Sequence, residues 1–238
     1  MNTLYLQEYM LINLQITFNT TMPKGDAMPR KDTITMKMTK NGNEYQIEER
    51  KYEQMEALLI HANDSMTSPC IFHLCSHIDK PDLFKLSKRD LIKNFERALK
   101  RQYKPLKQDC PKVFVIYSIE FKNTSQKEID GDDDAYDYAT YRLQEKLPFL
   151  HMHFYVIADC SKTIPSSFAN YARCALNEID GLRASRYFKS NKTDKVEIYK
   201  KLKSDIDDAF DRILYIGKIE QKTPDIPFHK KFGISKVA

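Results

Sequence analysis

The segment FLHMHFYVIA, residues 149–158, constrains the fold of this chain more than any other part of its sequence. A β-strand alternates its side chains between the two faces of a sheet. His151 and His153 are therefore expected on one face together with Tyr155, while the hydrophobic residues between them line the other face. The pattern predicts a buried strand with hydrophobic side chains on one face and ionisable side chains on the other.

The two histidines are spaced for metal binding. Alternate residues on one face of a strand are roughly 6–7 Å apart at the backbone, and at that spacing two imidazoles can converge on one cation. Neutral imidazole is a common ligand of divalent metals. His151 and His153 therefore predict half of a metal site, and the alternative is a pair of ordinary histidines.

Length and composition fit a folded protein. The 238 residues can form one domain, or one domain with an appendage. No apolar stretch approaches the roughly 20 residues of a membrane span, and the beginning of the chain carries Glu8 without a basic n-region, so no signal peptide is expected. The cysteines are scattered, odd in number and without a CxxC pair, which favours reduced thiols in a cytoplasmic protein.

The net charge of +5 is modest but unevenly distributed. Residues 83–112 contain ten Lys/Arg against three acids, and residues 181–238 contain fourteen against eight. The acids gather instead in EIDGDDDAYD, residues 128–137. Local basic surface suits a polyanionic partner such as DNA or RNA, and the alternative is a set of solvated helix faces.

The order of the predicted elements indicates an α+β fold. Residues 1–66 are read as an N-terminal extension, with a hairpin around Asn41-Gly42 and a helix over 51–61. The main domain is expected over 67–238. Besides the His-pair strand, strands are predicted over 70–78, 112–121 and 136–143, and helices after a capping box at Ser87 and Asp90, over 165–179 and over 194–218. Strands with helices beside them predict a sheet layered by helices.

A tyrosine flanked by cations lies near the end of the last predicted helix. Arg212, Tyr215, Lys218 and, if the helix continues, Lys222 are spaced three or four residues apart and share one face. Positive charge next to a phenol stabilises the phenolate, so Tyr215 is a candidate nucleophile toward a phosphodiester. The alternative is a partly exposed tyrosine whose ring covers the edge of the core.

The His-hydrophobe-His motif followed by a helix with Tyr-x-x-Lys resembles the HUH endonucleases. The stretch DRILYIGKIEQKTPDIPFHKKFGISK, residues 211–236, is similar to the filamentous-phage (inovirus) gene II replication-initiator family, including its final Phe-Gly-x-Ser-Lys segment. The resemblance covers roughly residues 70–236. It implies a central antiparallel sheet flanked by helices and a bacterial, cytoplasmic enzyme that nicks DNA.

The resemblance also implies the metal ligands. His151 and His153 become two of them, and the family supplies a Glu from the preceding strand. Glu120 is favoured because it ends the strand over 112–121, and Glu145 is the alternative. An imidazole–carboxylate set suits Mn²⁺, tolerates Mg²⁺ and would also hold Zn²⁺. The acidic segment before the His-pair strand departs from the short hairpin that is usual in the family.

Under the same resemblance, Tyr215 is the attacking nucleophile and Lys218 the neighbouring cation. The implied partner is single-stranded DNA or an origin hairpin, with a host helicase as a further partner and no membrane. The implied DNA-binding residues are Arg212, Lys222, Lys230 and Lys231.

Two other patterns are interpreted as structural. His73, Cys75 and His77 would share a strand face, but the outer pair would stand about 13 Å apart, too far for all three to bind one ion. Tyr199, with Lys203 one turn later, lies on the apolar stripe of its predicted helix.

The sequence therefore favours a metal-dependent, tyrosine-nucleophile enzyme that nicks and rejoins single-stranded DNA to start rolling-circle replication of a phage, prophage or plasmid. The first alternative is a catalytically inactive DNA-binding regulator with the same fold. The second is a zinc-dependent hydrolase that uses the His pair without a tyrosine nucleophile.

Overall fold

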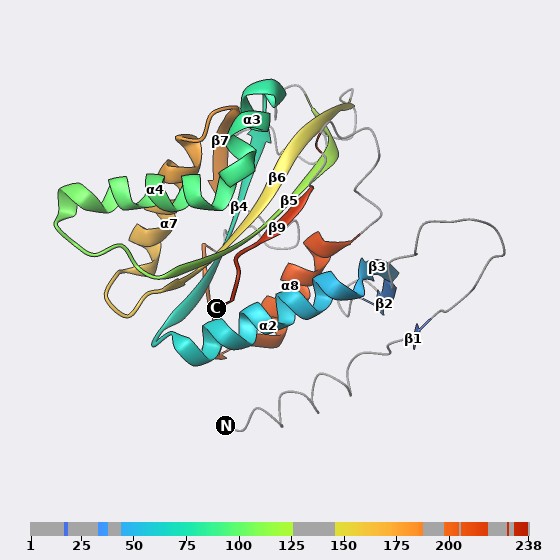
Figure 1. Ribbon diagram of the computed structural model, residues 1–238, viewed down its shortest axis with the longest axis horizontal. Coiled ribbons are helices and arrows are strands. Elements are labelled where there is room, and N and C mark those ends of the chain that lie inside the picture. Colours follow the sequence, from blue (N-terminus) through green and yellow to red (C-terminus); the bar gives the residue numbers. More distant parts are fainter. Residues whose placement is uncertain are drawn as a thin grey trace.

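The computed structural model describes residues 17–18, 33–37, 44–125, 146–187, 198–204, 206–218, 228 and 231–237. These residues form two antiparallel sheets with helices beside them (Figure 1). The smaller sheet joins β1 (Thr17–Phe18), β2 (Thr33–Lys37) and β3 (Glu44–Glu48). The antiparallel pairing of β2 with β3 confirms the predicted hairpin, although Asn41 and Gly42 themselves lie outside the described residues.

The larger sheet is the centre of the molecule. Its strands lie in the order β7, β4, β6, β5, β9, and β8 pairs with the beginning of β4. The bounds are β4 (Pro69–Ile78), β5 (Val113–Ser125), β6 (Lys146–Asp159), β7 (Leu182–Tyr187), β8 (Lys200–Lys201) and β9 (Phe232–Ile234). The predicted His-pair strand is β6, which lies between β4 and β5 and pairs with both.

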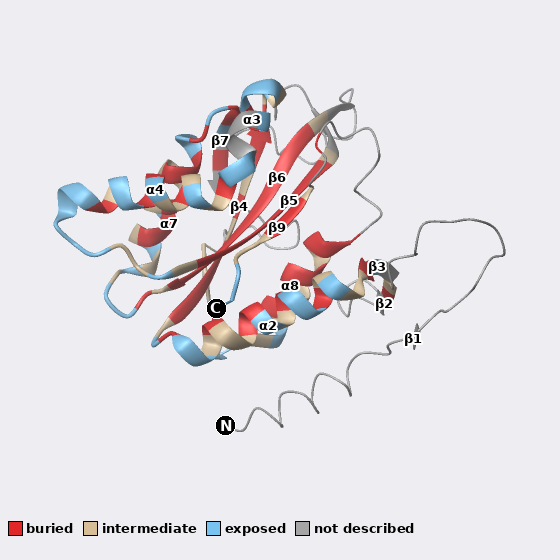
Figure 2. Cartoon of the chain, viewed as in Figure 1, coloured by how far each residue is buried: buried red, intermediate tan, exposed pale blue. Residues whose placement is uncertain are grey.

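One face of this sheet is covered by α3 (Pro81–Ser87), α4 (Leu91–Tyr103) and α7 (Pro165–Asn177). The alternate side chains of β6 that face these helices are Met152, Phe154 and Val156, all fully buried. Phe95 of α4 meets Phe154 edge to face with ring centroids 4.8 Å apart. Figure 2 shows the buried sides of α4 and α7 turned toward the sheet. The hydrophobic half of the predicted alternation is therefore confirmed as core.

The other face is covered by α2 (Glu49–Ser65) and α8 (Ile206–Gly217). Side chains of both helices pack in one buried cluster with Ile116 of β5 and Ile157 of β6. In Figure 1 the two helices lie side by side along this face. The arrangement confirms an α+β fold with an antiparallel sheet between layers of helices.

Helix α2, which was expected in the N-terminal extension, packs in the same core as α8. Met55, Leu58 and Ala62 of α2 are fully buried in the same cluster as Ile213 of α8. The helix therefore shares a hydrophobic cluster with the central sheet. Local sequence patterns cannot reveal this, because the partner face lies more than a hundred residues downstream.

Some predicted element boundaries also move. The helix predicted from a cap at Ser87 begins at Leu91, because Ser87 ends α3 and Lys88–Asp90 form the 3₁₀ helix η1. The helix predicted over 194–218 is confirmed only as α8, since the chain before it forms β8 and the 3₁₀ helix η4 (Leu202–Ser204). A short 3₁₀ helix η2 (Lys104–Leu106) follows α4. The strand predicted over 136–143 and the acidic segment lie outside the described residues.

The helices that the structure describes are short. The longest is α2, with 17 residues. Within the described part of the chain, none combines the length and the apolar character needed to cross a membrane.

Candidate metal centre

The histidines of the central strands, together with Glu120 and Cys75, lie on the face that carries α2 and α8. The antiparallel register places His151 of β6 directly opposite Glu120 of β5, and His153 directly opposite Cys75 of β4. Residues opposite each other in an antiparallel pair point to the same face. Strand alternation then adds Tyr155 to this face, two residues further along β6.

Glu120, His151 and His153 form a compact group. Their ligand atoms all lie within 4.8 Å of one another, and their exposed fractions are only 1%, 8% and 7%. His151 Nε2 lies 3.0 Å from His153 Nε2. Two nitrogens bound to one ion at about 2.0–2.1 Å, with angles near 90–110°, would be about 2.9–3.4 Å apart. The residues therefore fit a divalent metal ion.

The third member of the group is held in place by a hydrogen bond. Ser118 Oγ donates to Glu120 Oε1 over 3.0 Å, and both side chains are buried. A ligating carboxylate is normally oriented by such a neighbour. The structure thus brings Glu120, the favoured sequence candidate, to the histidines, while the alternative Glu145 lies outside the described residues.

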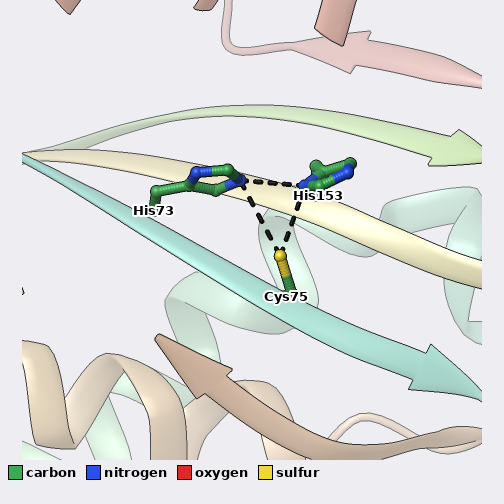
Figure 3. A group of neighbouring side chains, drawn as sticks. All are labelled: His73, Cys75 and His153. Atoms are coloured by element: carbon green, nitrogen blue, oxygen red, sulfur yellow. Dashed lines mark hydrogen bonds between the residues drawn. The ribbon is translucent and has the colours of Figure 1, made fainter. Parts of the chain in front are cut away.

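A second group shares His153 with the first. His73 Nε2 lies 2.9 Å from His153 Nδ1, and Cys75 Sγ lies 3.2 Å from the same nitrogen (Figure 3). The ligand atoms of His73, Cys75 and His153 also lie within 4.8 Å of one another. Packing is therefore not the only role open to His73 and Cys75. The distance argument against His73, Cys75 and His77 on one strand holds, but His153 on the neighbouring strand completes a group that could hold a metal ion.

His77 takes no part in this second group. Its ring meets Phe149 edge to face with centroids 5.1 Å apart, and it is buried opposite His151 in the register. Sequence reasoning missed the second group because it requires the register of β4 against β6. The signal that could have found it is the polar alternation of residues 73–77 within an otherwise apolar strand.

Burial keeps two side chains of this face neutral. It lowers the pKa of His73 well below the usual range of histidine, and the positive charge of Arg212 and the neighbouring His151 lower it further. Burial likewise raises the pKa of Tyr155 well above the ordinary value of 10.0. At neutral pH, His73 therefore keeps a nitrogen lone pair for ligation and Tyr155 keeps its hydroxyl proton.

Helix α8 crosses the face toward the histidines. It follows β8 and η4, which lie beside the first residues of β4, and the Tyr155 hydroxyl donates to the Arg212 carbonyl over 3.2 Å. The helix therefore advances from the Ile157 end of the sheet toward the His151 end (Figure 1). At about 1.5 Å per residue, Tyr215 lies about one turn beyond Arg212 in that direction. The Tyr215 ring is partly buried and packs against the hydrophobic cluster between α2, α8 and the sheet.

The predicted cations of the site have different environments. Lys218 is 1% exposed and its Nζ lies 3.4 Å from the centre of the Tyr215 ring. Arg212 Nε donates to Asp208 Oδ2 over 2.7 Å. The carbonyl of Lys231 accepts a hydrogen bond from Ile119 N–H beside β9. Lys222 and Lys230 lie outside the described residues.

The basic helix α4 lies on the opposite face of the sheet from the candidate centre. Arg101 makes a two-pronged contact with Glu178, and Lys93 lies 3.7 Å from Asp90. The cations of α4 therefore lie away from the face that carries Glu120, His151 and His153. Tyr199 is on this side too, with its ring 5.9 Å from that of Phe72, in line with the structural role expected for it.

Comparison of the chain with protein-family models, with curated proteins and with solved structures found no match.

Proposed function

We propose that this protein is a metal-dependent enzyme of the HUH endonuclease type. It nicks and rejoins single-stranded DNA through Tyr215 and thereby initiates rolling-circle replication of a phage, prophage or plasmid. The observation that carries the proposal is the buried group of Glu120, His151 and His153 on the sheet face that α8 crosses. The resemblance of residues 211–236 to the gene II initiator family supports the same assignment.

The donor set favours a particular class of ion. Two imidazoles and one carboxylate suit Mn²⁺ and accept Mg²⁺. A divalent ion at this position would polarise the phosphoryl oxygens of a bound DNA strand. Glu120 is held for this role by Ser118, and His151 and His153 are held by the backbone pairing of β6 on both sides.

The proposed reaction is a transesterification. The Tyr215 oxygen forms a bond to phosphorus while the bond from phosphorus to the 3′ oxygen breaks, and the phenol proton ends on the departing 3′ oxygen. The products are a 5′-phosphotyrosyl link and a free 3′-hydroxyl. Attack by a 3′-hydroxyl on the same phosphorus rejoins the strand and restores the tyrosine, so no external energy source is needed.

Lys218 and Arg212 give the nucleophile an electropositive setting. The Lys218 ammonium over the Tyr215 ring favours the anionic form of the phenol. Arg212 lies one turn earlier on α8, is partly exposed, and pairs with Asp208. Asp208 therefore holds the Arg212 guanidinium on the same helix as the nucleophile. From there the guanidinium can also bind a phosphate of the DNA strand.

The test is covalent capture of DNA. Wild-type protein is incubated with Mn²⁺ and a labelled pool of random single-stranded oligonucleotides, and is then separated by denaturing electrophoresis. We expect a protein–DNA adduct that Tyr215→Phe abolishes while DNA binding in a filter assay remains. Tyr199→Phe is the matched control, because it removes another phenol on the far side of the sheet, and it should form the adduct normally.

The other outcomes overturn the proposal in different ways. DNA binding by the wild type without an adduct or cleavage would favour the regulator with the same fold. Free 5′-phosphate products that Tyr215→Phe leaves unchanged would favour a hydrolase that uses the metal group alone.

A further inference from the structure

We infer that His73, Cys75 and His153 form a second metal site, which takes a soft divalent ion of the Zn²⁺ class and competes with the first group for His153. The three ligand atoms are His73 Nε2, Cys75 Sγ and His153 Nδ1 (Figure 3). The existence of this site stands on its own geometry. Its competition with the first group rests on the metal-binding role proposed above for Glu120, His151 and His153.

The distances between the ligand atoms match a zinc site. The nitrogens of His73 and His153 are 2.9 Å apart, and Cys75 Sγ lies 3.8 Å from His73 Nε2 and 3.2 Å from His153 Nδ1. With bonds of about 2.05 Å to nitrogen and about 2.3 Å to sulfur, a tetrahedral ion would separate its ligands by about 3.4–3.6 Å. The observed distances bracket these values, so small side-chain rotations suffice to admit the ion.

The backbone and a ring contact fix the three ligands. Cys75 is opposite His153 in the pairing of β4 with β6, and His73 is two residues before Cys75 on the same face. The His73 ring stacks on Tyr155, with centroids 4.0 Å apart and planes 16° from parallel. His73 and Cys75 are partly buried, and His153 is buried.

The thiol decides which ion this site prefers. Thiolate is a soft ligand that selects Zn²⁺ over Mn²⁺ and Mg²⁺, whereas the Glu120 group offers only nitrogen and oxygen. On binding, the Cys75 thiol releases its proton to solvent and the sulfur forms the bond to the metal. Three protein ligands leave the fourth tetrahedral position to water.

His153 couples the two sites because its nitrogens face different groups. Nε2 is 3.0 Å from His151 in the first group, and Nδ1 faces His73 and Cys75 in the second. A neutral imidazole carries a proton on one nitrogen and can bind metal only through the other. Binding of Zn²⁺ at Nδ1 therefore places the proton on Nε2 and removes a ligand from the first group.

The test uses Co²⁺ in place of Zn²⁺, because thiolate bound to Co²⁺ gives a charge-transfer absorption band. Wild-type protein and Tyr215→Phe should both show this band, and Cys75→Ser should lose it. Cys174→Ser is the matched control, because it removes a half-buried thiol on α7 across the sheet, and it should keep the band. No band in the wild type, or an unchanged band in Cys75→Ser, would overturn the second site.

A second variant and a stoichiometry complete the test. His73→Phe keeps a ring to stack on Tyr155 but removes a ligand, and should weaken Co²⁺ binding at the thiolate site by at least about 10-fold. Equal affinity would overturn the ligand set. Equilibrium dialysis should give one tightly held Co²⁺ per chain in the wild type, and still one in Glu120→Gln. Two ions in the wild type would overturn the competition for His153.

This experiment is independent of DNA cleavage. If Tyr215 forms no DNA adduct but the thiolate band behaves as expected, the second site stands and the nicking function fails. If the band is absent but the adduct forms, the reverse holds.

Discussion

The Lys218 ammonium nitrogen lies 3.4 Å from the centre of the Tyr215 ring, over its face. The sequence predicted a cation one helical turn from the tyrosine, and the contact shows how that cation is accommodated. Lys218 is 1% exposed, and a buried ammonium is costly unless its charge is compensated. The electron-rich ring face contributes to that compensation, so the lysine and the ring hold each other in place.

Replacing Lys218 by Met should slow formation of the DNA adduct by about 100-fold, since loss of one preorganised charge-stabilising group costs on the order of 10²-fold. Met keeps the length of the side chain and suits the buried position. Lys203→Met is the control, because Lys203 is exposed in η4, and it should leave the rate unchanged. Single-turnover rates measure the effect, and equal rates for Lys218→Met and wild type would contradict the proposed role.

Replacing Glu120 by Gln should weaken Mn²⁺ binding more than replacing Ser118 by Ala. Gln removes the anionic ligand, whereas Ala removes only the hydrogen bond that orients it, a loss of roughly 10-fold. Titration of the free Mn²⁺ signal in electron paramagnetic resonance gives both affinities. Wild-type affinity in Glu120→Gln would show that Glu120 is not a ligand.

Replacing Tyr155 by Phe should lower the free energy of unfolding by about 1 kcal/mol, because the hydrogen bond to the Arg212 carbonyl is lost. That bond ties α8 to β6, so adduct formation should fall as well. Tyr103→Phe is the matched control, since it removes a comparable bond to Thr163 on the far side of the sheet. Urea unfolding should show similar losses for both variants, and only Tyr155→Phe should slow the adduct.

The Asp159 carboxylate should make stability depend on pH in the acid range. Burial raises its pKa, but the N–H groups of Ser68, Ser161 and Thr67 outweigh burial and hold the pKa below the ordinary 3.8. The stabilisation is therefore present above about pH 4 and is lost as the pH falls through the lowered pKa. Asp159→Asn should cost on the order of 1 kcal/mol at pH 7.

The difference between Asp159→Asn and wild type should shrink as the medium becomes acidic. Urea unfolding at pH 7 and at pH 3 measures this. A constant difference at both pH values would show that the charge of Asp159 does not matter.

The sequence predicted β4, β5 and β6, because the alternation in β6 and the apolar run of β5 are local patterns. It did not predict β7, β8 and β9. Glu120 was favoured over Glu145 because the resembled family supplies a Glu from the strand before the His pair. The role of α2 in the main core and the place of Cys75 beside His153 were not predictable in the same way. Both depend on which residues face one another across strands or layers, and this is fixed by the whole sheet.

Because β6 lies between β4 and β5, the histidines and the tyrosine helix α8 are not held equally firmly. His151 and His153 are carried by backbone that is hydrogen-bonded on both sides, whereas α8 is held to the sheet mainly by side-chain contacts. Mild denaturant should therefore loosen the helix first, and the protein would still capture its ion after it had stopped attacking DNA.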